Sequence, residues 1–299
     1  MNLPIIDKTI ANKKVLIRGD IDVPLKDSKI VDDSRLQAIK PTIDFLLANN
    51  CQVTLCGHID RPEGKIVPEL STKPIQGYFP DIKVLENLRF DPGEEANDES
   101  LTKELAGGQD VYVNEAFATC ERAHASIVGV PKLLPHFAGF RLAKEIEILS
   151  KILENPAKPM VAIIGGIKWE TKESLIKKME TIADAVVVSK DLEQAEGGKD
   201  VKLEAIDKYA ETIARAATIV WNGPFGTVED FTYQVGTRRL AELITNNETA
   251  YKVVGGGDTV AFIHKLGLEN KFNWVSTGGG SMLKFLSGES LPGIEALYG

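Results

Sequence analysis

The chain has 299 residues, 43% of them hydrophobic and 26% charged, which is normal for a globular protein of one large or two ordinary domains. Its net charge of −8 argues against a broad surface for nucleic acid or an anionic membrane, so any phosphate site must be a local cluster. Three cysteines without a CxxC pair, no apolar stretch of membrane-spanning length and no secretion signal in the first ten residues lead us to expect a cytoplasmic protein.

The first half alternates strand-length apolar runs with helical patterns, which is the rhythm of βαβ units in a parallel sheet. Strands are predicted at Val15–Arg18, Gln52–Cys56, Ile82–Leu85 and Val111–Val113, and the longest helix at Ser34–Ala48. Asp33 or Ser34 is expected to cap this helix. Its predicted buried stripe has helical spacing and consists of Leu36, Ile39, Ile43, Leu46 and Leu47.

An amphipathic helix is predicted at Arg141–Leu153, followed by the breaker-rich segment Glu154–Pro159. We expect residues 141–153 to connect two domains, residues 1–140 and residues 154–299, with the last residues packing back on the first domain. Strands of the second series are predicted at Val161–Ile164, Ala185–Val188, Thr218–Trp221, Tyr251–Val254 and Asn273–Val275. The helices between these strands favour parallel order.

Three of these apolar runs end in a glycine cluster, at Gly165–Gly166, Gly255–Gly257 and Gly278–Gly280, before a helix-like segment. Glycine lacks a Cβ, so backbone N–H groups can approach an anion closely, and a helix start adds unpaired donors. One such junction is equally consistent with a simple turn, whereas three predict a polyanion site. The spacings of the dinucleotide fingerprint and of the P-loop are both missing.

Polar residues follow each predicted strand of the first half, at the sheet edge where ligands of open α/β sheets bind. They include four arginines, namely Arg18, Arg61, Arg89 and Arg122. Arg35, on the first turn of the first helix, could join them. Guanidinium groups that meet need an anion between them, because like charges repel. For any single arginine a surface ion pair is the alternative, and the neighbouring His58 and His124 are more often structural than catalytic.

Candidate ligands of a nucleotide follow the strands of the second half. Lys168 and Lys172 are expected to place two ammonium groups over one helix start. Asp258 adds a carboxylate for a hydrated magnesium ion, and Thr259 adds a hydroxyl for phosphate. Glu229 follows the strand that ends in Trp221 and is placed to accept from ribose hydroxyls.

In chain order, these motifs closely resemble the phosphoglycerate kinase family, whose members exchange a phosphoryl group between 1,3-bisphosphoglycerate and ADP. The resemblance covers nearly the whole chain. It is carried by Arg18–Pro24, Asp33–Arg35, His58–Pro62, Glu86–Phe90, Arg122–Ser126, Gly165–Lys168, Trp221–Gly226, Gly255–Thr259 and Ser276–Gly280. The resemblance implies an α/β fold of two Rossmann-like lobes, each a parallel sheet flanked by helices, joined by a hinge helix.

The resemblance also implies one ligand site in each lobe. In the first lobe, the residues that would bind phosphoglycerate are Asp20, Asp22, Arg35, His58, Arg61, Arg89 and Arg122. In the second lobe, the residues that would bind ATP or ADP are Gly165, Gly166, Lys168, Lys172, Asn222, Glu229, Gly256, Gly257, Asp258 and Thr259, with Asp258 as the ligand of Mg²⁺. Arg35, Lys168 and the helix start at Gly279 and Gly280 would stabilise the migrating phosphoryl group. We expect a monomer without nucleic-acid or membrane partners.

The sequence departs from the family pattern at several positions. The family usually has Asn at position 22 and Gly at position 60, so Asp22 and Asp60 add negative charge beside an anionic substrate. Each would oppose binding by roughly 1 kcal/mol or more at contact. Glu115, Ala118 and Glu121 stand where the family usually has Asp, Gly and His.

The chain is also shorter than family members usually are. A helix and a strand are missing between His58 and Glu86. Between Val188 and Ala217 the family's triple-glycine loop and the turn against adenine are missing as well. We therefore expect adenine to be held loosely or by different residues, while the phosphate half of the site is retained.

Three functions are open on this evidence. The first is a compact, working phosphoglycerate kinase that forms 3-phosphoglycerate and ATP by in-line transfer after lobe closure. The second is a non-catalytic descendant that binds a phosphorylated metabolite in a regulatory or scaffolding role, which the added carboxylates and the lost adenine wall favour. The third, a nicotinamide-dependent oxidoreductase, lacks the dinucleotide fingerprint.

Overall fold

The computed structural model describes residues 3–298, which form two compact units. The first unit holds the residues up to Glu147 together with those from Ser290 onward, and the second holds Ile148–Glu289. The boundary falls inside helix α5 (Phe140–Glu154), so this one helix contributes its first turns to the first unit and its last turns to the second. No helix among the described residues is both long and apolar enough to cross a membrane.

The first unit is built on a parallel five-stranded sheet in the order β5-β4-β1-β6-β7. Its strands are β1 (Lys14–Gly19), β4 (Gln52–Cys56), β5 (Lys83–Val84), β6 (Val111–Glu115) and β7 (His136–Ala138). Val15 pairs with Val53 on one side and with Val111 on the other, and all three side chains belong to the core of this unit. The predicted strands are confirmed, except that β7 was not predicted.

Helix α1 (Ser34–Ala48) has the predicted bounds. Four residues of its stripe, Leu36, Ile39, Ile43 and Leu46, are fully buried, and Leu47 is partly buried. The predicted cap position is confirmed at Asp33, but its side chain makes no capping hydrogen bond. Asp33 occupies the N-cap position, but its carboxylate accepts from the side chains of Gln37 and Tyr78, and the Ser34 N–H donates instead to Asp32 Oδ1 at 2.8 Å.

Shorter elements of the first unit were not predicted, because runs of two to eight residues carry little periodicity. They are β2 (Leu25–Lys26), β3 (Lys29–Ile30), α2 (Lys73–Tyr78), α3 (Pro92–Ala96), α4 (Glu99–Ala106) and α12 (Pro292–Glu295). Helix α12 is held against the first unit because the Gly293 N–H donates to Cys120 O at 2.9 Å. A Cβ at Gly293 would lie 2.8 Å from the Cα of Cys120, so only glycine allows this close approach.

The start of α5 is organised by a buried carboxylate. Glu115, at the end of β6, accepts from the Thr42 hydroxyl at 2.5 Å and from the backbone N–H groups of Arg141 and Leu142 at 2.9 and 3.0 Å. A Cβ on Gly139 would collide with this carboxylate. Burial raises the pKa of Glu115 to about 7, although the three donors act in the opposite direction.

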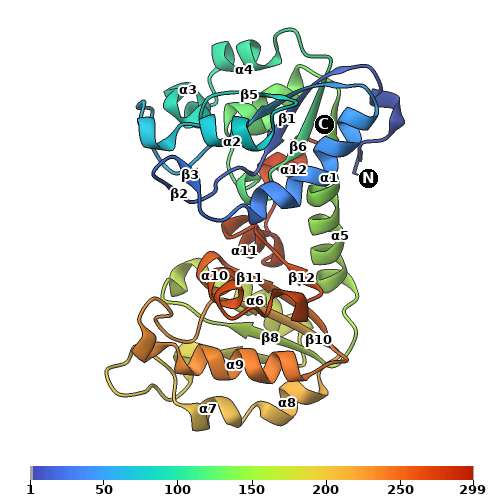
Figure 1. Cartoon of the computed structure of the whole chain (residues 1–299). Helices are drawn as coiled ribbons and strands as arrows, with labels where there is room; N and C mark the ends of the chain where they lie inside the picture. Colours follow the sequence, from blue (N-terminus) through green and yellow to red (C-terminus); the bar gives the residue numbers. More distant parts are fainter. Residues whose placement is uncertain (1–2, 299) are drawn as a thin grey trace. The chain divides into compact units, whose positions relative to one another are not determined.

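The second unit is built on another parallel five-stranded sheet, in the order β12-β11-β10-β8-β9. Its strands are β8 (Met160–Ile164), β9 (Ala185–Val188), β10 (Thr218–Asn222), β11 (Tyr251–Gly255) and β12 (Trp274–Val275). Its helices are α6 (Glu173–Ile182), α7 (Leu203–Asp207), α8 (Ala210–Arg215), α9 (Val235–Asn246), α10 (Gly257–Lys265) and α11 (Gly280–Leu286). In Figure 1, α7, α8 and α9 lie together on one side of these strands, and α6 and α10 lie on the other.

In each sheet the chain order reverses at one place. The first sheet grows from β1 to β4 and β5 on one side, and then from β6 to β7 on the other. The second grows from β8 to β9, and then from β10 outward on the opposite side. A crevice forms beyond the carboxyl ends of the two strands at such a reversal, so ligand sites are expected after β1 and β6 and after β8 and β10.

Candidate active site

Arg35 and Asp20 form the ion pair that borders the first crevice. Asp20 follows β1, and Arg35 lies on the first turn of α1 with its Nη1 atom 2.6 Å from Asp20 Oδ1. The Asp20 side chain is buried, whereas 29% of the Arg35 side chain is exposed. This carboxylate raises the pKa of Arg35, so the guanidinium is held in place and charged.

Arg18 does not belong to the predicted cluster of arginines around an anion. It is fully buried, and its guanidinium donates to Ser126 Oγ at 2.9 Å, to Gly19 O at 2.5 Å and to His58 Nδ1 at 2.9 Å. The prediction failed because these internal acceptors use the donors of Arg18. Arginine can only donate, so His58 Nδ1 is the acceptor and the ring proton lies on Nε2.

His58 is therefore a neutral ring at the carboxyl end of β4. Burial and the nearby Arg18, Arg89 and Arg35 lower its pKa well below the ordinary value. Its Nε2 atom lies 3.8 Å from Asp22 Oδ2. At neutral pH this ring can present a hydrogen bond but carries no charge.

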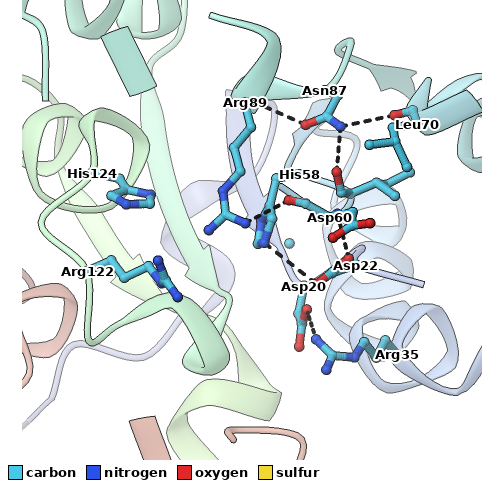
Figure 2. A network of polar contacts seen from close by, with 12 residues as sticks. Asp20, Asp22, Arg35, His58, Asp60, Leu70, Asn87, Arg89, Arg122 and His124 are labelled. Atoms are coloured by element: carbon cyan, nitrogen blue, oxygen red, sulfur yellow. Dashed lines mark hydrogen bonds and ion pairs between the residues drawn. The ribbon is translucent and has the colours of Figure 1, made fainter. Parts of the chain in front are cut away.

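The added carboxylates at positions 22 and 60 differ in their placement. Asp22 is half-buried, and its Oδ1 accepts from the Asp60 N–H at 2.9 Å, as Figure 2 shows. The Asp60 side chain is exposed, and the residue has φ of 55°, in the left-handed region. Its carbonyl accepts from Arg89 Nη1 at 2.8 Å. Asp22 thus fixes the turn that positions Arg89.

The side chains of Arg89, Arg122 and His124 converge on one region, although these residues come from different parts of the chain. Figure 2 shows the side chains of Arg122 and His124 pointing toward the same region as the guanidinium of Arg89. Arg89 is 4% exposed, and burial together with the charge of Arg122 lowers its pKa. Burial and the same guanidinium groups lower the pKa of His124 to about 4, so its ring is neutral.

Carboxylates lie near the guanidinium groups of this region, with Asp20 beside Arg35 and Glu121 Oε1 3.9 Å from Arg122 Nε. Glu95 Oε1 lies 3.2 Å from Arg89 Nε, and buried Glu94 accepts from the N–H and hydroxyl of Ser126. His124 Nδ1 is buried and has no hydrogen-bond partner among the described residues. Arg61 follows the same strand as His58, but its side chain is exposed. Arg89 and Arg122 therefore gather with the neutral ring of His124, and the charges of Arg89 and Arg35 both act on the neutral ring of His58.

The crevice of the second unit is formed by two glycine turns that touch each other. The Gly165 N–H, after β8, donates to Asn222 O at 2.9 Å, and the Gly166 N–H donates to Pro224 O at 2.7 Å. A Cβ at Gly165 would collide with the backbone of Pro224. Gly166 and Gly223 have φ of 99° and 93°, values that only glycine adopts readily.

Lys172 is buried in this crevice, whereas Lys168 is exposed. The Lys172 ammonium donates to Gly165 O, and its Nζ lies 3.3 Å from Asn222 Oδ1. Burial lowers the pKa of Lys172 to about 8, although the charge of Asp258 acts in the opposite direction. Lys168 is exposed at the turn before α6. The expected pair of ammonium groups over one helix start is therefore split between an inner and an outer lysine.

The start of α10 brings the Gly255–Thr259 motif to the same edge. Thr259 is fully buried, and its Oγ1 accepts from the Gly223 N–H at 3.0 Å, which ties α10 to the turn after β10. Gly256 has φ of 96°, and Gly257 and Asp258 are exposed on the first turn. Gly279, with φ of 51°, precedes α11.

The residues fit a magnesium ion that arrives with a nucleotide, and they do not fit a protein-only metal site. No group of three or more His, Cys, Asp and Glu side chains that could hold a metal occurs among residues 3–298. Mg²⁺ is commonly held by one or two carboxylates together with substrate phosphates and water. The exposed carboxylate of Asp258 meets this requirement.

A cavity of about 410 Å³ extends from the glycine turns across the carboxyl ends of β9, β8 and β10. Its lining includes Gly166 and Asp258 at the glycine turns, and Glu229. It also includes the half-buried Trp169, which is not among the site residues predicted from the sequence. The signal was present, since an aromatic residue directly follows the Gly-Gly-Ile-Lys run.

Comparison with known families agrees with this geometry. The family model described as phosphoglycerate kinase matches residues 5–81, 79–189 and 186–289. A phosphoglycerate kinase of Dictyoglomus turgidum is 34% identical over an alignment 387 positions long, which covers 99% of this chain and 98% of the relative. One of Moorella thermoacetica is 33% identical, with 99% and 98% covered.

Solved structures give the same result for the fold. The phosphoglycerate kinase of Coxiella burnetii superposes with a TM-score of 0.85 at 31% identity, covering 96% of each chain. That of Pyrococcus horikoshii superposes with a TM-score of 0.82 at 26% identity, covering 97% of this chain and 96% of the other. The similarity therefore includes both units and nearly the full length of these relatives.

Proposed function

The chain belongs to the phosphoglycerate kinase family, and on this basis we propose that it transfers a phosphoryl group between 1,3-bisphosphoglycerate and ADP. The observation that carries the proposal is that each unit gathers cationic or N–H donor groups where its chain order reverses. The first unit offers three guanidinium groups, and the second offers a buried ammonium with glycine turns. Both sets suit phosphate.

In the first unit, the proposed ligand is phosphoglycerate. Arg89 and Arg122 bind its phosphate or carboxylate, because the bidentate guanidinium fork matches both groups. The neutral rings of His58 and His124 contribute hydrogen bonds without further charge repulsion. We assign to Arg35 the stabilisation of the migrating phosphoryl group, since Asp20 holds this guanidinium while leaving part of it exposed. The exposed Arg61 is assigned to the outer rim of the site.

In the second unit, the proposed ligand is Mg-ADP or Mg-ATP. The start of α10 at Gly256–Gly257 presents backbone N–H groups, and Lys172 and Asn222 add side chains beside it. The Gly165–Gly166 turn shapes the crevice, with its own N–H groups donating to Asn222 O and Pro224 O. Lys168 is assigned to the transferring phosphate, with the start of α11 at Gly279 and Gly280. Mg²⁺ held by Asp258 and the nucleotide would neutralise phosphate charge. Thr259 orients the phosphate turn through Gly223, and Glu229 is assigned to the ribose.

The proposed chemistry requires no acid or base from the protein. A terminal phosphate oxygen of ADP attacks the acyl phosphate, the bond between phosphorus and the carboxyl oxygen breaks, and 3-phosphoglycerate leaves as a carboxylate. Catalysis then rests on positioning and on charge stabilisation of the PO₃ group. Because the two ligands are bound by different units, transfer requires the units to close around them, and we assign the hinge to α5.

The decisive experiment is a coupled assay of ATP-dependent turnover of 3-phosphoglycerate by the wild type, Arg35→Ala and Lys168→Ala. We expect turnover by the wild type and a large loss in both variants, which would tie activity to both units. Absence of turnover in a folded wild-type protein would contradict the proposal.

A second candidate is a non-catalytic protein that binds a phosphorylated metabolite. The observation in its favour is Asp22, whose carboxylate lies within 3.8 Å of His58 at the proposed substrate site. Calorimetry with 3-phosphoglycerate and Mg-ADP separates the two candidates, because binding of both ligands without turnover supports only the second.

A further inference from the structure

One wall of the cavity beside the Gly165–Gly166 turn is formed by a single segment of the second unit, residues 189–200. Ser189, Lys190, Gln194, Gly198 and Lys199 of this segment line the cavity. The rest of the lining comes from Gly166, Ile167 and Trp169 after β8, from the loop after β10 and from Asp258. At about 410 Å³, the cavity is within the range of small-molecule sites, which is roughly 300 to 1,000 Å³.

The segment is fixed in place and is not a loose connection. Its buried carboxylate, Asp200, accepts from the Val201 N–H at 2.8 Å and from the Gly236 N–H at the start of α9 at 3.1 Å. The Thr227 N–H donates to Lys199 O at 3.0 Å, which joins the segment to the turn after β10. The Gln194 side chain donates to Ser189 O and Leu192 O at 2.9 Å each. These contacts make a preformed wall.

The chemistry of the cavity fits a flat, partly aromatic ligand with a negative end. Trp169 supplies an indole ring, and the ammonium of Lys190 lies 5.6 Å from its centroid. Aromatic side chains stack on nucleobases, and a nearby cation adds to the attraction. At the other end, Gly166 adjoins the Lys172 ammonium, since a Cβ there would lie 2.9 Å from Lys172 Nζ. The phosphate and base halves of a nucleotide would thus meet complementary ends.

We propose that Trp169 and the 189–200 wall form the nucleoside subsite of this chain, with the indole ring stacked on the base of a bound nucleotide and Lys190 beside it. This inference rests on the proposed function, because it takes the adjoining glycine turns as the phosphate site. It adds the residues that recognise the base, for which the glycine and lysine motifs offer no candidate.

The test compares two probes by calorimetry on the full chain: Mg-ADP, and Mg-pyrophosphate, which has the phosphates without a nucleoside. In the wild type, we expect Mg-ADP to bind more tightly than Mg-pyrophosphate. Trp169→Ala should weaken the binding of Mg-ADP roughly tenfold or more and leave the binding of Mg-pyrophosphate unchanged. The affinity of Trp169→Phe for Mg-ADP should lie between those of the wild type and Trp169→Ala. Glu193→Gln, an exposed position of the same segment outside the cavity lining, is the matched control and should change neither.

Equal binding of the two probes by the wild type would overturn the proposal, as would Mg-ADP binding that is unaffected by Trp169→Ala. Loss of binding of both probes by Trp169→Ala would also overturn the proposal, because the residue would then shape the phosphate site. The outcome is separable from that of the proposed function. Trp169-dependent binding of Mg-ADP without turnover would retain the subsite and reject the kinase, whereas turnover with Trp169-independent binding would do the reverse.

Discussion

The Nη1 atom of Arg35 lies 2.6 Å from the buried carboxylate of Asp20, on the edge where β1 ends and α1 begins. This contact fixes a guanidinium at the proposed reaction centre. We predict that Arg35→Ala lowers kcat by about 10²- to 10³-fold, the usual effect of removing one donor that stabilises transition-state charge. Lys40→Ala, on the exposed face of the same helix, is the control and should retain full activity. Activity of Arg35→Ala within threefold of the wild type would reject the role.

Asp22→Asn should improve binding of 3-phosphoglycerate. The asparagine keeps an oxygen that can accept from the Asp60 N–H, so the turn is preserved while the negative charge is removed. Loss of roughly 1 kcal/mol of repulsion corresponds to about a fivefold lower KM for 3-phosphoglycerate. Steady-state kinetics at fixed Mg-ATP measures it, with the exposed Asp27→Asn as the control. A higher KM would show that the carboxylate assists binding.

Binding of Mg-ADP should weaken as the pH rises through about 8. Burial lowers the pKa of Lys172 to about 8, so its amino group is protonated and charged below this pH and neutral above it. The charged form attracts phosphate, and affinity is therefore greatest below pH 8. Calorimetry between pH 7.5 and 9.5 should show the decline in the wild type. Lys172→Met should bind weakly at every pH, and a matching decline in that variant would assign the titration to another group.

Glu115→Gln should destabilise the protein at neutral pH. The amide nitrogen would face one of the N–H donors at the start of α5, which leaves a buried donor unpaired at a cost of about 1 to 3 kcal/mol. Urea unfolding followed by far-UV circular dichroism measures this loss. Glu147→Gln, on the exposed side of the same helix, should be close to neutral.

The same residue predicts a pH dependence of stability. The pKa of Glu115 is raised from 4.5 to about 7, so the folded state binds the proton more tightly than the unfolded state. Its contribution to stability is therefore greatest below pH 4.5 and decreases as the pH rises toward 7. The stability difference between the wild type and Glu115→Gln should change across this window, and a constant difference would contradict the raised pKa.

The sequence predicted the regular elements well, because long buried strands and an amphipathic helix leave periodic signals. The bounds of α1, β4 and β9 agree with the prediction. Strand β7 was missed, since three residues beside a proline have no periodicity and the strand exists through its pairing with β6. Tertiary contacts of this kind are invisible to local patterns.

The candidate site was only partly predictable, and the reason is tertiary context. Residues after the strands were selected correctly as neighbours of a sheet edge, because parallel strands end together. Whether a side chain faces the crevice depends on distant partners. Arg18 donates to Ser126, which is 108 residues away, and the Thr259 hydroxyl accepts from the Gly223 N–H. Local spacing contains neither fact.

The return of the chain to the first unit has a consequence for biosynthesis. The first unit is interrupted after Glu147 and receives its remaining residues only from Ser290 onward. A ribosome therefore releases the whole second unit, an uninterrupted segment, before α12 can reach its place beside Cys120. Nascent domains usually fold in the order in which they emerge, and here the domain that begins first is completed last.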